Sequence, residues 1–144
     1  MGTLDFSELS SKPAGENLEG LVRLIGERLG LTVSWTGRGA DQGRDLIFTE
    51  TQSGRIGSTP VRWLVNCKDN SKTNQSVSEQ DVGSVVDKVR QHDCAGFLLA
   101  TTTTVGAALK AKLDALQDNP PDRIQTRVWD RFELTAMLLS DPFA

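Results

Sequence analysis

The order of hydrophobic patterns along the chain limits its fold more than any other feature of the sequence. Strand-like patterns occur at 31–35, 44–50, 61–68, 95–101 and 124–129. A helical pattern at 16–29 precedes the first of them, and further helical patterns follow the third, fourth and fifth. Between the second and third strands, residues 52–60 indicate a turn or hairpin loop. Three strands in succession, followed by alternating helices and strands, predict an α/β fold with one mixed sheet, helices on both faces and the order α-β-β-β-α-β-α-β-α.

Capping residues mark where the predicted helices begin. Ser78 and Asp81 form a capping-box pattern, in which each side chain accepts a hydrogen bond from the backbone amide of the other residue. Thr103 or Thr104 is expected to cap the following helix, and Asp130 the last one, which ends near residue 139. The helix that begins at Ser78 is expected to bury a single stripe of valines: Val82, Val85, Val86 and Val89.

The composition indicates one domain with its own hydrophobic core. The chain has 144 residues, of which 38% are hydrophobic, and we expect a polar N-terminal segment at 1–14 and the folded domain at 15–140. No apolar run approaches the roughly 18 residues of a transmembrane helix, and the N-terminus lacks the pattern of a signal peptide. Two cysteines and one histidine exclude a disulfide scaffold and a zinc finger. A cytoplasmic protein without a membrane partner is therefore expected.

A polar pair follows the apolar part of the third predicted strand. Asn66 and Lys68 are two residues apart, so both side chains lie on one face of the strand. Asp45 lies at the start of the second strand, and a hairpin between the two strands would bring it beside this pair. Carboxylate and amide oxygens suit Mg²⁺, and a nearby lysine can orient a water molecule or stabilise developing charge. The pattern therefore predicts a metal-assisted catalytic site at this edge of the sheet.

At these residues the sequence resembles the PD-(D/E)xK nuclease superfamily, and within it the restriction endonuclease domains of the Mrr type. The resemblance covers residues 18–139, nearly the whole chain. It is carried by Leu18-Glu19 in the first helix, by GADQGRDLI at 39–47, and by Val65-Asn66-Cys67-Lys68. The family pattern is a helix with a glutamate, a Gly-Asp-x-Gly-x-Asp loop that enters a strand, and a Glu/Gln-x-Lys strand.

The resemblance implies a restriction-endonuclease-like domain that hydrolyses DNA phosphodiester bonds with Mg²⁺, for which Mn²⁺ is expected to substitute. Asp45, Asn66 and Glu19 would then be the metal ligands, and Lys68 would join them as a catalytic residue. Such domains are often effector modules of bacterial restriction or antiviral defence proteins, so we expect a sensor domain outside this chain. Because a double-strand cut usually needs two active sites, a homodimer is a further expectation.

One position departs from the family pattern. Asn66 stands where the family has glutamate or glutamine, so this ligand has a shorter side chain than either and no charge. Another carboxylate would have to compensate, and the candidates are Glu19, Asp41 and Glu79. The departure and the acidic pI of about 5.1 favour an alternative function, that of a cleavage-deficient nuclease-like module that binds DNA or another partner.

Contacts with DNA have to come from a local patch, because the formal net charge of the chain is −3. Residues expected to border the site or contact DNA are Asp41, Gln42, Arg44, Lys72 and Thr102. Thr102 belongs to a run of four threonines at 101–104, and a position before a helix suits a DNA phosphate. Helix capping explains the same run without a ligand, and both interpretations are open at this point.

Overall fold

A sheet of five strands forms the middle layer of the structure, a computed structural model that describes residues 16–35, 46–70, 73–118 and 123–139. The sheet is mixed, as predicted, because β1–β2 and β2–β3 pair antiparallel whereas β3–β4 and β4–β5 pair parallel. Among the described helices, none combines the length and the apolar character needed to cross a membrane. In chain order the elements are α1 (Glu16–Arg28), β1 (Thr32–Trp35), β2 (Leu46–Ser53), β3 (Ser58–Lys68), α2 (Glu79–Val82), α3 (Val85–Gln91), β4 (Gly96–Thr101), α4 (Ala107–Asp118), β5 (Gln125–Trp129) and α5 (Arg131–Leu138).

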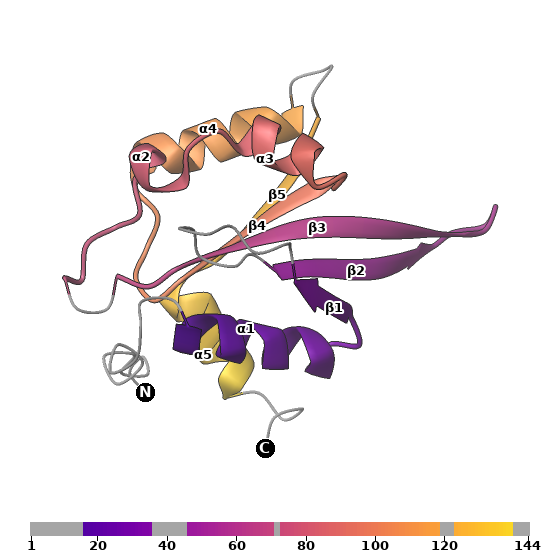
Figure 1. Cartoon of the computed structure of the whole chain (residues 1–144), viewed down its shortest axis with the longest axis horizontal. Helices are drawn as coiled ribbons and strands as arrows, with labels where there is room; N and C mark the ends of the chain where they lie inside the picture. The colour runs from indigo at the N-terminus through magenta and orange to yellow at the C-terminus, as the bar shows by residue number, and fades with distance from the viewer. Residues whose placement is uncertain (1–15, 36–45, 71–72, 119–122, 140–144) are drawn as a thin grey trace.

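Helices cover both faces of the sheet, with α2, α3 and α4 on one side and α1 and α5 on the other (Figure 1). Each face has its own hydrophobic core. Ile47, Leu64 and Leu99 belong to the core beneath α2–α4, whereas Val65 and Leu98 belong to the core beneath α1 and α5. Adjacent residues of a strand thus face opposite ways, as the two-residue period of a strand requires. We call the two sides the α2–α4 face and the α1–α5 face.

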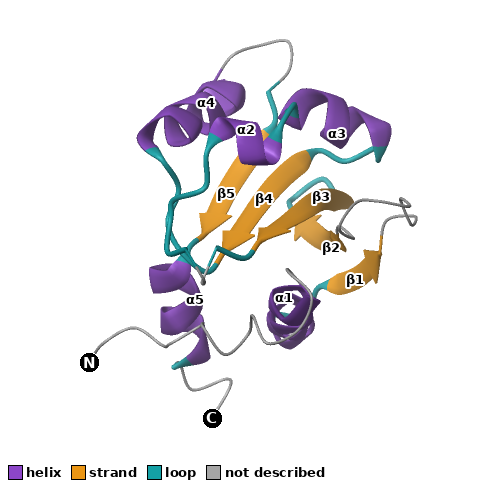
Figure 2. Cartoon of the chain, turned by 60° about the vertical axis from the view of Figure 1, so that its left-hand side comes forward, coloured by secondary structure: helices purple, strands orange, loops and turns teal. Residues whose placement is uncertain are grey.

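The carboxyl ends of the parallel strands β3, β4 and β5 meet at one edge of the sheet. Figure 2 shows the arrows of β4 and β5 pointing toward α5, and β3 runs parallel to them. The central strand is β3, because the strands follow their chain order across the sheet. Ligands of open α/β sheets bind at such a carboxyl edge. The fold therefore directs the search for a functional site to the end of β3.

The predicted helix that begins at Ser78 is two helices. The Ser78–Asp81 capping box is present, but α2 ends at Gly83, where φ is +76°. A glycine adopts this conformation without steric cost, and the chain then starts α3 from the N-cap Ser84. The valine stripe survives the break, because Val82, Val85 and Val89 are buried in one core and Val86 packs against it.

The threonines expected to cap α4 do not do so. The helix begins at Ala107, and the amide of Lys110 donates to the carbonyl of Gly106. Val105, which forms an isolated parallel β-bridge with Val77, lies between these threonines and the helix. By contrast, the cap of α5 is confirmed, because the Asp130 carboxylate accepts from the amides of Phe132 and Glu133.

The loop predicted at 52–60 is mostly strand. β2 and β3 continue to Ser53 and from Ser58, and only a tight turn closes the hairpin, where the Gly54 amide donates to the Gly57 carbonyl at 2.9 Å. Residues 51–60 are exposed, so this part of the hairpin carries no alternation between buried and exposed positions. No hydrophobic period marks this part of the hairpin, so its sequence is typical of a loop.

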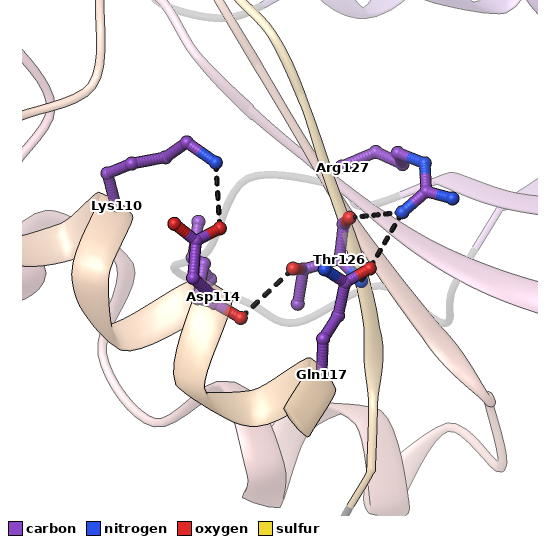
Figure 3. Close-up of polar contacts among 6 residues, drawn as sticks. Lys110, Asp114, Gln117, Thr126 and Arg127 are labelled. Carbon is purple, nitrogen blue, oxygen red and sulfur yellow. Dashed lines mark hydrogen bonds and ion pairs between the residues drawn. The ribbon is translucent and has the colours of Figure 1, made fainter. Parts of the chain in front are cut away.

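Side chains protect part of the open edge of β5, the last strand of the sheet (Figure 3). The Thr126 amide donates to Gln117 Oε1 at 3.4 Å, and the Thr126 carbonyl accepts from Arg127 Nη1 at 2.8 Å. Arg127 Nη1 also donates to Gln117 Oε1 at 2.7 Å. One amide and one carbonyl of this edge are therefore already paired, which hinders the addition of another strand there.

Candidate active site

The predicted polar pair lies at the end of β3, on the carboxyl edge of the sheet. Asn66 is buried, with 4% of its surface exposed, and Lys68 is half-buried. Their Cα partners on β4 are Leu99 and Thr101. Because Leu64 belongs to the core of the α2–α4 face, the alternation of β3 puts Asn66 and Lys68 on that face too. Strand alternation in the structure agrees with the prediction that the two side chains share one face.

The second strand starts at the same edge. β2 begins at Leu46, whose Cα partner on β3 is Val65, the residue before Asn66. The antiparallel hairpin on which the prediction for Asp45 depends is therefore present. Some predicted residues lie outside the described ranges: Asp41, Gln42, Arg44, Asp45 and Lys72.

Glu19 comes from the layer on the other side of the sheet. It is buried, with 9% of its surface exposed, beside Leu18, which belongs to the core of the α1–α5 face. Asn66 and Lys68 face the opposite way, so a site that contains all three side chains has to lie at the end of the sheet.

The described residues contribute oxygen donors that suit a hard divalent cation. Glu19 offers a carboxylate and Asn66 an amide carbonyl, and Mg²⁺ and Mn²⁺ accept both ligand types. No three histidine, cysteine, aspartate or glutamate side chains in the described ranges form a group that could hold an ion. Glu79 is exposed at the start of α2, with its Oε2 3.9 Å from Lys112 Nζ. Glu19 and Asn66 therefore offer ligand types that suit Mg²⁺ or Mn²⁺. One further carboxylate is needed to complete the site.

The threonine run contacts the segment that follows β3. Thr102 donates to Asp69 Oδ1 at 3.0 Å and accepts from the Asn70 amide at 2.9 Å. Thr103 donates to the Gln75 carbonyl at 2.7 Å. The sequence gives no signal for these pairs, because their members lie 28 to 33 residues apart in the chain. The run thus binds protein groups instead of capping a helix.

The two cysteines lie outside the candidate site. Cys67 packs against the core of the α1–α5 face and so faces away from Asn66 and Lys68. Burial raises the pKa of the Cys94 thiol above its ordinary value of 9.0, although the neighbouring Arg62 lowers it. A raised pKa keeps this thiol protonated and poorly nucleophilic near neutral pH.

The match to a known protein family covers most of the chain. Residues 11–138 match the family model Mrr_cat, described as restriction endonuclease. This chain belongs to that restriction endonuclease family. The predicted resemblance to restriction endonuclease domains of the Mrr type is therefore confirmed. Among curated proteins, this restriction endonuclease domain has no significant match.

Two solved restriction endonucleases share the fold of this restriction endonuclease domain. The DNA modification-dependent restriction endonuclease AspBHI superposes with a TM-score of 0.58, at 15% identity, over 96% of this chain and 39% of that protein. The MspJI restriction endonuclease, in complex with a 27-mer oligonucleotide, has a TM-score of 0.52 at 20% identity, over 96% of this chain and 35% of that protein. The chain thus spans well under half the length of either protein.

Proposed function

We propose that this restriction endonuclease domain hydrolyses DNA phosphodiester bonds with a divalent metal ion. The observation that carries the proposal is the register of β2 and β3, in which Leu46 is opposite Val65. Asp45 precedes Leu46 in the sequence, and Asn66 follows Val65. One further pair in this antiparallel register would bring Asp45 opposite Asn66, with about 4.5–5.5 Å between their Cβ atoms.

In this proposal Asp45, Asn66 and Glu19 hold the metal. Asp45 and Glu19 supply carboxylates and Asn66 a carbonyl oxygen, so the expected ion is Mg²⁺, with Mn²⁺ as a substitute. When bound, such an ion supplies Lewis acidity, which polarises the scissile phosphate and lowers the pKa of a bound water molecule. Glu19 has to reach the site around the end of the sheet, because α1 lies on the α1–α5 face.

Lys68 acts beside these ligands. Its side chain is half-buried on the face that Asn66 also occupies. We assign it two roles: orienting the attacking water molecule and stabilising the negative charge that develops on the phosphate oxygens. Around this centre, the residues proposed to border the site or contact DNA are Asp41, Gln42, Arg44 and Lys72, whereas the buried Thr102 borders the site without touching DNA.

The proposed context is the effector module of a longer bacterial restriction or antiviral defence protein in the cytoplasm. The MspJI structure contains an oligonucleotide, and the chain spans only 35% of that protein and 39% of AspBHI. A sensor domain elsewhere in the longer protein would select the target DNA. Two copies of the domain would cut both strands, so we include a homodimer in the proposal.

Asn66 favours one alternative function. A neutral amide at a ligand position holds a cation more weakly than a carboxylate does. The net charge of −3 also gives the domain no general attraction for DNA. In this alternative the domain retains the fold and binds DNA or another partner without cleaving it.

Relaxation of supercoiled plasmid by the whole chain tests the proposal against this alternative. Nicked or linear DNA is expected with Mg²⁺ or Mn²⁺ and not with EDTA. Asp45→Ala is expected to abolish cleavage, whereas Asp118→Ala, at the exposed end of α4, keeps it. Absence of cleavage together with a DNA gel shift in Ca²⁺ would support the binding module, and absence of both would leave the fold as a scaffold only.

A further inference from the structure

We propose that Thr102 is a positioning residue for Lys68. Its buried hydroxyl ties the two residues after Lys68 to the carboxyl end of β4, and so holds the end of β3 that carries the lysine side chain. The inference rests on the proposed nuclease function, in which Lys68 acts on the reacting phosphate. It deepens that function by assigning a role to a residue whose sequence context suggested a DNA contact.

The hydroxyl of Thr102 is engaged inside the protein. Only 3% of the residue is exposed. Its hydroxyl donates its proton to Asp69 Oδ1 at 3.0 Å and accepts the Asn70 amide at 2.9 Å. Because the proton points to a carboxylate, it is not available to a phosphate oxygen. Removing this buried hydroxyl takes away both hydrogen bonds at once, which costs more than the loss of a single exposed hydrogen bond.

Thr102 acts where the ladder between β3 and β4 stops. Lys68 and Thr101 are the last Cα partners of these strands. Beyond them the Asn70 amide bonds to the side chain of Thr102 instead of to a strand backbone. The hydrogen bond from the Asn70 amide to Thr102 therefore replaces the next backbone hydrogen bond between β3 and β4. Its loss lets the ends of these two strands fray.

The same threonine run also holds the far end of the segment that follows β3. Thr103 donates to the Gln75 carbonyl at 2.7 Å, and the Val77 amide donates to the Thr104 carbonyl at 2.8 Å. The segment is therefore attached to the end of β4 at both its ends. Thr102 is the member of the run that holds the residues next to the lysine.

Small displacements at this point are expected to affect catalysis. Misplacing a catalytic group by about 1 Å can lower a rate by about 10²-fold. Thr102→Val keeps the shape of the side chain and removes both hydrogen bonds. We therefore expect it to lower the cleavage rate about tenfold, because it loosens the strand end without removing any reacting group.

The test compares three variants of the whole chain. Thr102→Val removes the hydroxyl, and Thr102→Ser restores it. Thr126→Val is the matched control, because it removes another buried hydroxyl, which donates to the Leu113 carbonyl at 3.0 Å between β5 and α4. In single-turnover cleavage with saturating Mg²⁺, we expect a loss of about tenfold for Thr102→Val, near-parental rates for the other two variants, and equal DNA affinity in Ca²⁺ for all.

Two further readouts distinguish positioning from a general loss of stability. In a Lys68→Ala background, Thr102→Val should leave the residual cleavage rate unchanged, because the positioned group is already gone. In the metal-free protein, the Asn70 amide should exchange hydrogen about tenfold faster in Thr102→Val, and the Cε resonance of Lys68 should shift.

The outcomes separate this inference from the function on which it rests. An Asn70 amide with parental exchange and an unshifted Lys68 resonance in Thr102→Val would overturn the positioning role. A rate loss that persists undiminished in the Lys68→Ala background would overturn it too. If the parent does not cleave DNA at all, the nuclease function fails, and the two spectroscopic signals still decide whether Thr102 positions Lys68.

Discussion

Leu46 of β2 and Val65 of β3 are Cα partners at the carboxyl edge of the sheet, and both are completely buried on the α1–α5 face. A shift of this register by one residue would turn buried apolar side chains toward the other face, so the pairing is strongly specified. Asp45 and Asn66 are their neighbours in the sequence. The packing that stabilises the sheet thus also fixes the position of Asn66 on β3.

Lys68→Ala is expected to lower the cleavage rate by about 10²-fold or more at saturating Mg²⁺, because it removes a group that orients water or stabilises charge. DNA binding in Ca²⁺ should change little. Lys112→Ala is the matched control, because Lys112 is exposed on α4 and makes a long surface contact, 3.9 Å from Glu79. Parental turnover by Lys68→Ala would remove the lysine from the mechanism.

Asn66→Glu is expected to tighten Mg²⁺ binding, because it adds a charge and one methylene of reach at a ligand position. Without metal, the buried carboxylate should lower the melting temperature below that of the parent. Mg²⁺ should then raise the melting temperature of this variant more than that of the parent. Cleavage should appear at a lower metal concentration.

Asn66→Gln is the control for this experiment, because it adds the same methylene without the charge. Only the glutamate variant should gain stability from Mg²⁺ beyond the parental gain. If Asn66→Glu is destabilised and Mg²⁺ does not restore it, Asn66 is a structural amide and not a metal ligand.

Gln117→Ala is expected to increase self-association, because it uncovers the Thr126 amide on the edge of β5. It also removes the contact with Arg127, so we expect a loss of about 0.5–1.5 kcal/mol in the free energy of unfolding. Sedimentation velocity over a range of concentrations measures the association. The control is Gln91→Ala at the exposed end of α3. Equal association of both variants would show that the edge needs no such protection.

The half-buried thiol of Cys94 is expected to make the stability of the fold depend on pH. Burial raises its pKa in the folded state, so the neutral thiol stabilises the fold below the ordinary pKa of 9.0. This contribution is lost as the pH rises through the folded-state pKa, because the unfolded chain ionises more readily. Urea unfolding between pH 8 and 11 should therefore show a steeper loss of stability for the parent than for Cys94→Ala. Parallel curves would contradict the raised pKa.

Hydrophobic periodicity predicts most of this fold. The mixed sheet with helices on both faces follows from the order of strand-like and helical patterns, and the buried valines Val82, Val85 and Val89 follow from helical spacing. Alternation along β3 also puts Asn66 and Lys68 on one face, because a strand has a fixed period of two. These features depend on residues that are close together in the sequence, so they can be predicted from the sequence alone.

Features that leave no hydrophobic pattern in the sequence cannot be predicted from it. The outer half of the β2–β3 hairpin is exposed, so no buried period distinguishes it from a loop. The break between α2 and α3 depends on the backbone conformation of Gly83, while the valine stripe continues across it. The contacts of Thr102 join segments more than thirty residues apart, and only the completed sheet brings them together.

Anomalous scattering from crystals soaked in Mn²⁺ shows directly whether Asp45 and Asn66 hold a divalent ion. The proposed position of this ion is beside the start of β2 and the end of β3. The predicted result is an anomalous peak about 2.1 Å from both an Asp45 carboxylate oxygen and Asn66 Oδ1, with Lys68 beside it. A crystal that shows no ion between these residues at saturating Mn²⁺, with both side chains ordered, would contradict the account.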